Sequence, residues 1–541
     1  MRAKIIFIFI FISLFSLKSI TQSSYADDNA KLAALSKQII EAKSCSVVRA
    51  NLDEASKLYS QDNKYNDLVD FLNSVLKQKS DCVGQVNYYI ALSRYQQLKY
   101  LEESQGWDEY FAKGNDYRSQ ITESSQKALE TLSADDPLAV STRILLWQFH
   151  RDQQDTFNEQ ALNDLVNSLD EYAKNGKDIQ IIKSAADKIY SYGEKGKAKE
   201  IYRLYVGKIT SSALSNEELG NIAAGFLKEG NVDLAETIYD VYIDRITKNL
   251  PKDKSVPLLI SLAKVFAFSP SSGQDQAGKD MIYAEKIFAK IEGIGGKDSF
   301  NEALNYLRAL NLEKTKDYPK SRDQYLDFSL KYPESAHNSE AIFKVAVIDT
   351  YILHDRKAGN DYFVKLTEQE KLTPQSISAL YQLGLLSQWD NDTQKAKAYY
   401  NKLIEKANGN FSETVMSAKD RLKEIESSQP LENNLKLFLD LALKDENSQF
   451  DMSRVNLSVS PYLAKKDAQV AVNSNSNAGS SGCLQVDLQY AWSADLGSAK
   501  PQANMTTFPT SYKDAGTKVV FLVVSSNGTI LDRSLDMLDV E

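Results

Sequence analysis

The residue types that most often do chemistry in enzymes are sparse and scattered in this sequence. Of 541 residues only three are histidines, His150, His337 and His354, and none belongs to an HExxH motif or a triad-like arrangement. Acidic residues are plentiful, but the sequence places no pair of them across a cleft. The sequence therefore predicts a protein that binds rather than reacts, with no catalytic residue, no cofactor and no metal site.

Two short motifs resemble phosphate and calcium loops but lack residues that such loops need. In 293–297, GIGGK, Ile291 stands at the first glycine position of GxxxxGK[ST], and Asp298 replaces the serine or threonine. In 390–392, DND, the glycine and the distal glutamate of a calcium loop are missing. We interpret the first motif as a surface loop and the second as a polar turn between two helices.

The three cysteines, Cys45, Cys82 and Cys483, have no metal-ligand spacing and form no CxxC motif. Cys45 and Cys82 both lie near the ends of predicted helices. A disulfide between them would close a loop of ~37 residues and stabilise the fold by roughly 3–4 kcal/mol in the loop-entropy model. The alternative is two small buried thiols. Cys483 follows a Ser/Asn/Gly-rich loop, and its role stays open.

Residues 1–26 have the pattern of a signal peptide. Arg2 and Lys4 form a charged start, 5–17 is an apolar run too short to span a bilayer, and 24–26 is a small-x-small cleavage site. No later apolar run is long enough for a membrane helix, so we expect no transmembrane segment after cleavage. The sequence thus predicts an exported chain, and an exported chain can form disulfides.

Composition narrows the fold class and the partners. The hydrophobic content of 43% is that of a globular protein, and 11 prolines are few for this length, as expected of a mostly helical chain. The formal net charge is −9 before the basic signal peptide is removed. Because nucleic-acid binding needs clustered lysine and arginine, this charge argues against a nucleic-acid partner.

The elements that must carry any binding site are helices, and between residues 301 and 409 they repeat three times. One small position holds Ala309, Ala346 and Gly384, and a second holds Ser321, Ala358 and Ala396. Four residues after the second position stand Tyr325, Tyr362 and Tyr400. Two helices approach closely only where side chains are small, and an aromatic ring one turn further on fills the gap between hairpins.

This pattern resembles the tetratricopeptide repeat, a helix–turn–helix unit of about 34 residues. Looser copies place Ala186 with Ala198 and Tyr202, Ala223 with Ala235 and Tyr239, and Ala263 with Ala284 and Phe288. We therefore expect tetratricopeptide-like repeats over 177–430 and degenerate helical-hairpin repeats over 27–176. The resemblance implies a mostly α fold, a helix–turn–helix solenoid, that binds protein or peptide segments.

In this repeat family the residues three before and one after the first small position line the groove that holds peptides. The resemblance therefore implies a partner-binding groove formed by Tyr306, Leu310, Phe343, Val347, Tyr381 and Leu385. Aromatic anchors carry much of the energy of an interface. The alternative is that the register is displaced by one and that the aromatic rings pack inside the hairpins.

After the repeats the period of the sequence changes. Residues 431–454 are expected to be a capping helix and a linker, and from 455 the spacing of apolar residues becomes two. Strands are predicted over 455–460, 469–473, 484–492, 517–525 and 529–535. Val519, Phe521 and Val523 make the fourth of these strands apolar on both faces. Since such a strand should be covered on both sides, we expect its outer face to dock on the helices or on a partner.

Residues 455–541 resemble the PKD domain, an immunoglobulin-like β-sandwich of exported proteins. Tyr490-Ala491-Trp492 matches the Tyr-x-Trp of that family, and 512–516, YKDAG, matches its Tyr-x-x-x-Gly corner. The stretch 493–497, SADLG, departs from the family's Asp-Phe-Gly-Asp-Gly. The resemblance implies a small all-β sandwich after the helical repeats.

Taken together, these patterns predict a non-enzymatic scaffold in the periplasm or at the surface of a Gram-negative bacterium. Residues 332–335, YPES, are similar to the Tyr-Pro-x-Ser of bacterial envelope repeat proteins, which organise outer-membrane or cell-wall assembly. One alternative is an adhesion or polysaccharide-binding protein that acts through the PKD-like domain on glycan or cell wall. Another is an accessory subunit of an envelope enzyme.

Overall fold

The computed structural model describes residues 31–268, 274–444, 455–476, 488–496, 506–526 and 529–541. The chain divides into two compact units, Met1–Phe226 with Asp233–Tyr242, and Leu227–Val232 with Ile243–Glu541. The predicted signal peptide and Cys483 lie outside the described residues.

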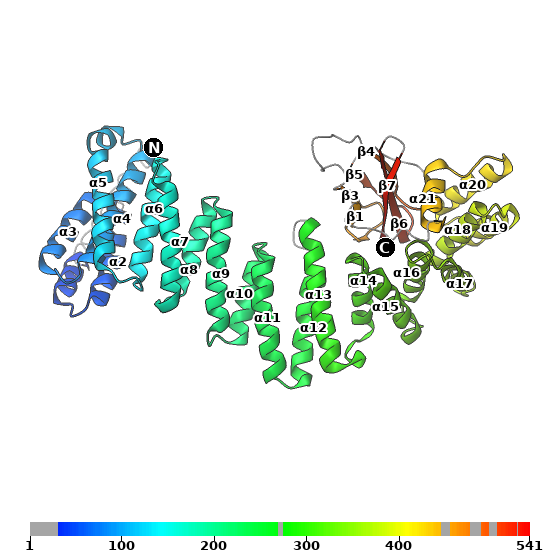
Figure 1. Ribbon diagram of the computed structural model, residues 1–541, viewed down its shortest axis with the longest axis horizontal. Helices are drawn as coiled ribbons and strands as arrows, with labels where there is room; N and C mark the ends of the chain where they lie inside the picture. The colour runs from blue at the N-terminus through cyan, green and yellow to red at the C-terminus, as the bar shows by residue number, and fades with distance from the viewer. Residues whose placement is uncertain (1–30, 269–273, 445–454, 477–487, 497–505, 527–528) are drawn as a thin grey trace, which may run out of the picture. The chain divides into compact units, whose positions relative to one another are not determined.

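The first unit consists of helices joined by short turns (Figure 1). After a helical stretch at 31–41, its helices are α2 (Cys45–Gln61), α3 (Tyr65–Gln78), α4 (Val83–Glu103), α5 (Trp107–Thr131), α6 (Pro137–Gln153), α7 (Asn158–Asn175), α8 (Gln180–Ser191) and α9 (Lys195–Ser211). Two further helices, α10 (Asn216–Lys228) and α11 (Val232–Asn249), contribute residues to both units. A disulfide between Cys45 and Cys82, with Cα atoms 5.4 Å apart, ties the start of α2 to the start of α4, as predicted.

The second unit continues with helical hairpins. Its helices are α12 (Lys252–Phe268), α13 (Gln274–Gly295), α14 (Glu302–Lys314), α15 (Tyr318–Lys331), α16 (Asn338–Tyr351), α17 (Arg356–Thr367), α18 (Pro374–Trp389), α19 (Thr393–Ala407), α20 (Ser412–Glu426) and α21 (Asn433–Lys444). A short 3₁₀ turn, η1 (Lys297–Ser299), follows α13 in the glycine-rich stretch. The three predicted repeats are the hairpins α14–α15, α16–α17 and α18–α19, so the predicted helical-repeat fold is confirmed.

Side-chain caps mark where α14, α18 and α19 begin. The Asn301 side chain accepts a hydrogen bond from the Leu304 amide at 3.0 Å, and Asp392 accepts one from the Lys395 amide at 3.1 Å. Thr373 and Ser376 form a reciprocal capping box at the start of α18. The predicted turn at 390–392 is thus the connection between α18 and α19, with Asp392 as its helix cap.

Small residues hold the helices of each hairpin close together. A Cβ atom added at Gly384 would lie 2.5 Å from the Tyr400 ring, so α18 and α19 touch where glycine leaves room. The Ser321 hydroxyl donates to the Ala309 carbonyl at 3.0 Å in the first repeat. In the second repeat the predicted register is wrong by one residue, because Gly359 rather than Ala358 approaches α16. Phe363, one turn after Gly359, is then buried in place of Tyr362.

The last part of the chain forms two sheets that pack face to face. Its strands are β1 (Val455–Ser460), β2 (Leu463–Ala464), β3 (Val470–Ser476), β4 (Leu488–Ser493), β5 (Thr507–Thr510), β6 (Gly516–Ser526) and β7 (Thr529–Val540). The sheets have the orders β1-β3-β5 and β2-β7-β6-β4, with only the short β2–β7 pair parallel among the described strands. Leu457, Val472, Trp492 and Leu522 belong to the core between them. Each predicted strand lies on an observed one, whereas β2 and β5 were not predicted.

The outer face of β6 docks on the helices of the second unit. Val519, Phe521 and Val523 are almost fully buried and share one hydrophobic cluster with residues of α16, α18 and α21. The Phe521 ring stacks on Phe438 of α21, with centroids 4.4 Å apart. The predicted docking of this face is therefore confirmed, and its site is the chain's own helical array.

The sandwich approaches the start of α18, and α21 packs against α16. A Cβ atom added at Gly516, the first residue of β6, would lie 2.8 Å from Pro374 at the start of α18. We expected the helix after the repeats to cap the array, but α21 lies against α16 and β4. The Tyr351 ring of α16 is 6.0 Å from the Phe438 ring.

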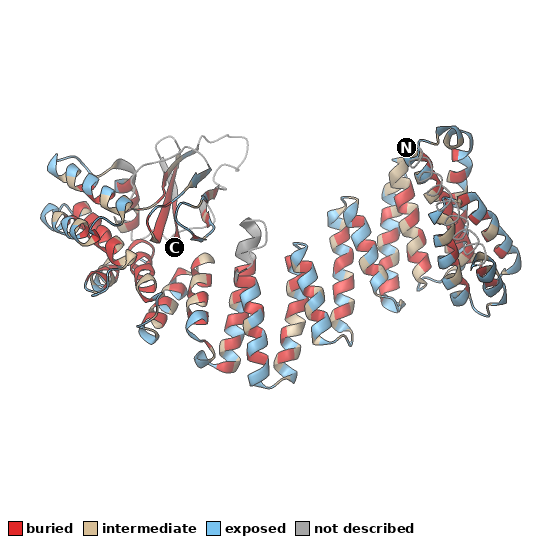
Figure 2. Ribbon diagram, turned by 180° about the vertical axis from the view of Figure 1, so that it is seen from behind, coloured by how far each residue is buried: buried red, intermediate tan, exposed pale blue. Residues whose placement is uncertain are grey.

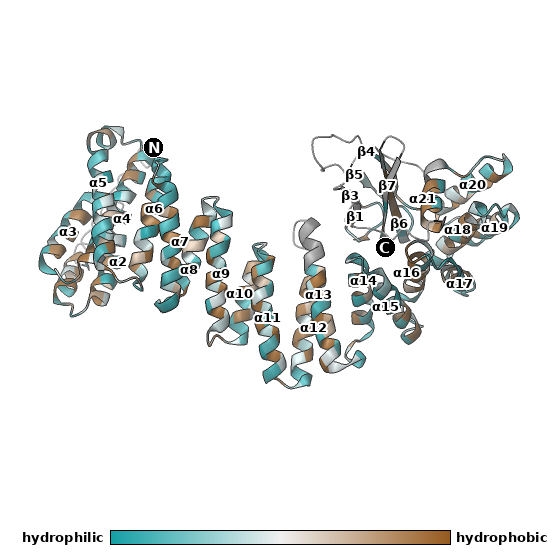
Figure 3. Ribbon diagram, viewed as in Figure 1, coloured by the Kyte–Doolittle hydropathy of each residue, from teal (hydrophilic) through white to brown (hydrophobic). Residues whose placement is uncertain are grey.

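Burial follows the hydropathy of the helices. Figure 2 shows buried residues recurring along the helices, and Figure 3 shows hydrophobic residues between hydrophilic ones along the same helices. The exceptions are α16 and α18, where nearly every residue of the middle turns is buried. These two helices lie between the second helices of their hairpins and the sandwich, so both of their sides are covered.

Candidate interaction site

The structure places the three aromatic residues of the predicted groove inside their hairpins. Each ring contacts an aromatic ring on the second helix of its own hairpin, with centroids 5.3–5.7 Å apart: Tyr306 with Phe328, Phe343 with Phe363, and Tyr381 with Tyr400. Phe343 and Tyr381 are fully buried, whereas Tyr306 is half-buried. Phe343 and Tyr381 thus pack inside their hairpins, as in the alternative, whereas Tyr306 also lines a cavity.

The three aliphatic residues of the predicted groove differ from one another in what covers them. Val347 and Leu385 are fully buried in the cluster that includes the outer face of β6. Leu310 is half-buried and lines a cavity together with Tyr306. The chain's own sandwich thus covers Val347 of α16 and Leu385 of α18, whereas Leu310 of α14 is open to the cavity.

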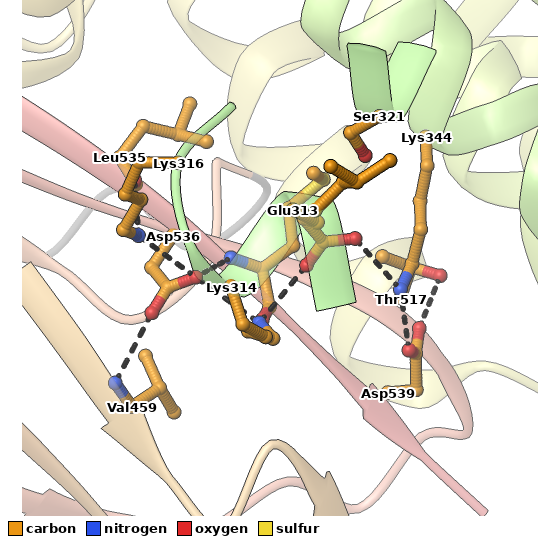
Figure 4. Close-up of polar contacts among 12 residues, drawn as sticks. Glu313, Lys314, Lys316, Ser321, Lys344, Val459, Thr517, Leu535, Asp536 and Asp539 are labelled. Atoms are coloured by element: carbon orange, nitrogen blue, oxygen red, sulfur yellow. Dashed lines mark hydrogen bonds and ion pairs between the residues drawn. The ribbon is translucent and has the colours of Figure 1, made fainter. Parts of the chain in front are cut away.

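Next to this open part lies a group of buried charges that joins α14 and α16 to β7. We call it the ion network; it consists of Glu313, Lys314, Lys316, Lys344, Asp536 and Asp539 (Figure 4). The Lys344 ammonium lies 2.7 Å from Asp539 and 3.1 Å from Glu313. The Lys314 ammonium lies 2.9 Å from Glu313 and 3.1 Å from Asp536, and that of Lys316 lies 3.2 Å from Asp536.

Hydrogen bonds hold the aspartates of the ion network in place. The Thr517 hydroxyl donates to Asp539 at 2.7 Å, and the Val459 amide donates to Asp536 at 3.2 Å. The Tyr318 hydroxyl of α15 donates to the Leu535 carbonyl of β7 at 3.1 Å. Because buried charges are tolerated only when they are paired and hydrogen-bonded, these contacts fix β7 against the helices in one register.

The lysines keep both aspartates ionised in spite of their burial. Burial acts to raise the pKa of Asp536, but Lys314 and Lys316 outweigh it and hold that pKa below its ordinary value. Burial likewise acts to raise the pKa of Asp539, but the charge of Lys344 and the hydrogen bonds from Glu340, Lys344 and Thr517 together outweigh it and lower that pKa. Removal of any of these lysines would therefore leave a carboxylate buried without its counter-charge.

A cavity of about 930 Å³ opens beside the ion network. Its helical wall comes from the start of α14, from α16 and from the start of α18, and includes Tyr306 and Leu310. Its other wall comes from the sandwich, and includes Tyr462, Leu463 and Val540. The lining is mostly apolar, which is typical of sites that bind ligands or peptide side chains.

Polar groups converge at the helical wall of this cavity. The Tyr306 ring stacks on His337, with centroids 4.5 Å apart and an interplanar angle of 22°. The Tyr306 hydroxyl donates to Glu340, and the same carboxyl group lies 3.4 Å from His337 Nδ1. Burial, followed by the charge of Asp539, raises the pKa of Glu340 well above its ordinary value.

The residues that could do chemistry make structural contacts. His150 Nδ1 lies 2.7 Å from Asp155 just after α6, and His354 Nδ1 lies 2.9 Å from the Ala442 carbonyl of α21. Among the described residues, the one group with close metal-ligating atoms is Cys45, Asp81 and Cys82, and both of its sulfurs are used in the disulfide.

The first unit has a smaller cavity of about 500 Å³ against α6 and α7. Arg143 and His150 line it from α6, and Asp164 and Glu171 line it from α7. Burial lowers the pKa of Arg143, whose charge faces these two acids. The lining is more polar than that of the larger cavity, and its charges already face one another.

Reasoning from the sequence missed the ion network and the sandwich wall of the large cavity. The one available signal was the position of the charges: Lys344 stands in the apolar run 341–348, and Asp536 stands between Leu535 and Met537. A charged residue at an otherwise apolar position predicts a buried partner, but it does not identify that partner.

Comparison with known proteins gives a limited result. No family model and no curated protein matches the sequence. Among solved structures, the C-terminal part of a tetratricopeptide-repeat protein from Cytophaga hutchinsonii matches 51% of this chain and 98% of its own, at 14% identity and a TM-score of 0.25. The tetratricopeptide-repeat domain of P58(IPK) matches 71% of this chain and 99% of its own, at 12% identity and a TM-score of 0.18. At such low TM-scores these likenesses carry no argument.

The described residues were also compared with the requirements of a bilayer. None of their helices is both long enough and apolar enough to span a membrane.

Proposed function

We propose that this protein is a non-catalytic scaffold that holds a segment of a partner protein in the large cavity beside Tyr306 and Leu310. The observation that carries the proposal is the cavity itself, which is about 930 Å³ and mostly apolar. It lies beside α14, the first helix of its hairpin, where the sandwich does not pack directly on the helix. A site of this size suits a few side chains of an extended segment.

The sandwich is part of the proposed site rather than a separate binding module. It supplies Tyr462 and Leu463 to the cavity wall, and Leu463 is 52% exposed there. The burial of Val519, Phe521 and Val523 against helices supports a fixed position for this wall. An adhesion protein acting through a PKD-like domain alone would need the sandwich to work without the helices, so we favour the scaffold.

The proposed place of action is the envelope of a Gram-negative bacterium, in the periplasm or at the surface. It is supported by the signal-peptide pattern of residues 1–26 and by the Cys45–Cys82 disulfide, which needs an oxidising compartment to persist. Outer-membrane or cell-wall assembly is the process that the Tyr-Pro-x-Ser similarity at 332–335 suggests.

Site-specific photo-crosslinking in cells that export the protein tests this function. A photoreactive residue at Leu463 should give adducts with a partner, and one at Leu330, a 68% exposed leucine of α15 outside the cavity, should not. Leu310→Trp places a larger side chain in the cavity without adding charge and should abolish the Leu463 adducts. Equal adducts at both positions, or adducts that survive Leu310→Trp in a protein with unchanged circular dichroism, contradict the proposal.

A further inference from the structure

The lining of the large cavity carries charge of one sign. Its described lining residues include four acids, Glu302, Glu340, Asp539 and Glu541. The described lining includes no lysine and no arginine. His337 is the one basic type among them, and it is exposed. A segment that enters the cavity therefore meets acidic side chains on several sides.

Not all of this acidity is neutralised by the ion network. The Asp539 carboxylate is paired with Lys344 at 2.7 Å, and Thr517 donates to its other oxygen. Glu340 lies further from the same ammonium, at 3.7 Å, and receives the Tyr306 hydroxyl. Glu302, at the start of α14, is exposed. Burial and the charge of Asp539 keep the pKa of Glu340 high, so the open negative charge of the helical wall is that of Glu302.

The rest of the lining suits the stem of a long basic side chain. Leu307 and Leu310 form an apolar floor, and the rings of Tyr306 and Tyr462 stand on the two walls. Lysine and arginine side chains lay their methylene groups on apolar surface while the charged end meets polar groups.

We infer that the cavity recognises a partner segment by a lysine or arginine side chain flanked by apolar residues, with Glu302 facing the cation and the Glu340 carboxyl group accepting a hydrogen bond from it. This inference rests on the proposed function, because it specifies the partner's chemistry at the same site. Tyr306 positions the Glu340 carboxyl through its hydroxyl group, and Leu310 and Leu463 contact the flanking apolar side chains.

Selection from a random-peptide display library on the purified, disulfide-bonded protein tests the inference. Peptides that Leu310→Trp no longer binds define the cavity's ligands. These peptides should be enriched in lysine or arginine next to apolar residues. The double change Glu302→Gln with Glu340→Gln should weaken them by about tenfold or more, which is roughly 1.4 kcal/mol. Glu334→Gln, an exposed glutamate outside the cavity, is the matched control and should leave binding unchanged.

The possible outcomes distinguish failure of the inference alone from failure of the proposed function. Cavity-dependent peptides that are acidic or uncharged, or that bind the double glutamine variant equally well, overturn the inference and leave the scaffold function in place. If Leu310→Trp affects no selected peptide, both are overturned. Should the double variant fail to fold, Glu302→Gln alone gives the same test, because Glu302 is exposed.

Discussion

Lys344 of α16 and Asp539 of β7 lie 2.7 Å apart as a buried ion pair, although 195 residues separate them in the sequence. Together with Lys314 and Asp536 they connect the helical repeats to the last strand of the sandwich. A domain that was joined to the repeats by a linker alone would not share buried ion pairs with them. The sandwich and the hairpins α14–α19 should therefore unfold together.

Substitution of Lys344 tests this coupling. Lys344→Met keeps the length of the side chain but leaves Glu313 and Asp539 buried without their shared cation, which we expect to destabilise the second unit by about 3–5 kcal/mol. The measurement is the urea dependence of hydrogen exchange in peptides from α16 and β7. Lys357→Met, at an exposed position of α17, is the control and should change stability little. Equal effects of the two substitutions contradict a central role for the ion network.

Stability should pass through a maximum with pH. The pKa values of Asp536 and Asp539 are lowered in the folded state, so their stabilisation is complete above the unfolded value of about 3.9 and is lost as pH falls through the lowered values. The pKa of Glu340 is raised, so the folded state holds an extra proton, and stability decreases as pH rises from about 4.3 toward that raised value.

Glu340→Gln tests whether Glu340 causes the decrease of stability at higher pH, separately from the loss of stability in acid. Glutamine still accepts a hydrogen bond from Tyr306 but cannot lose a proton, so urea midpoints measured against pH should keep the acid limb and lose the decrease at higher pH. A decrease of the same size in the variant would show that Glu340 is not its cause.

Two glycines in helices should respond to alanine in opposite ways. Gly384→Ala places a methyl group 2.5 Å from the Tyr400 ring, and we expect a loss of about 1–3 kcal/mol from overpacking. Gly207→Ala, in α9, meets nothing within 4 Å and should stabilise its helix by up to about 1 kcal/mol. Thermal unfolding followed by circular dichroism measures both. Equal shifts of the same sign would contradict the close approach of α18 and α19.

The aromatic stack between the sandwich and α21 can be measured by a double-mutant cycle. Phe521→Ala and Phe438→Ala each remove a buried ring and should cost about 3–5 kcal/mol. Because the two rings stack at 4.4 Å, the double variant should lose less than the sum of the two, by about 0.5–1.5 kcal/mol. Additive losses, measured by urea unfolding, would mean that the two rings do not interact in solution.

The Cys45–Cys82 disulfide determines how many thiols of the denatured protein react before and after reduction. Of the three cysteines, only Cys483 should react with a maleimide when the exported protein is denatured without reductant, and all three should react after reduction. Cys45→Ser with Cys82→Ser should destabilise the first unit by roughly 3–4 kcal/mol. Three reactive thiols before reduction, in protein taken from its natural compartment, would contradict an oxidised pair.

The hairpins could be predicted from the sequence because the information that defines them is local. Ala309 and Gly384 mark where two successive helices touch, and the buried rings of Tyr325 and Tyr400 follow at a fixed distance. The second repeat shows the limit of this reasoning. Ala358 and Gly359 are both small, so the spacing alone did not show which of them faces α16.

The site could be predicted only in part, because its two walls are far apart in the chain. Apolar residues on both faces of β6 predicted that the strand is covered, whereas the groove role of Leu310, which lines the cavity, stays a prediction. The ion network was not predicted, since no local pattern pairs Lys344 with Asp539. Leu463 was missed because a two-residue strand has no detectable period, and Tyr462 stands just before that strand.

The distance along the chain between Lys344 and Asp539 also has a consequence for biosynthesis. Ribosomes add about 5–20 residues per second, so α16 leaves the ribosome on the order of ten to forty seconds before its counter-charge on β7 exists. During that interval the apolar and cationic face of α16 is exposed to solvent. A nascent or translocating chain in this state offers chaperones a surface that the finished protein hides.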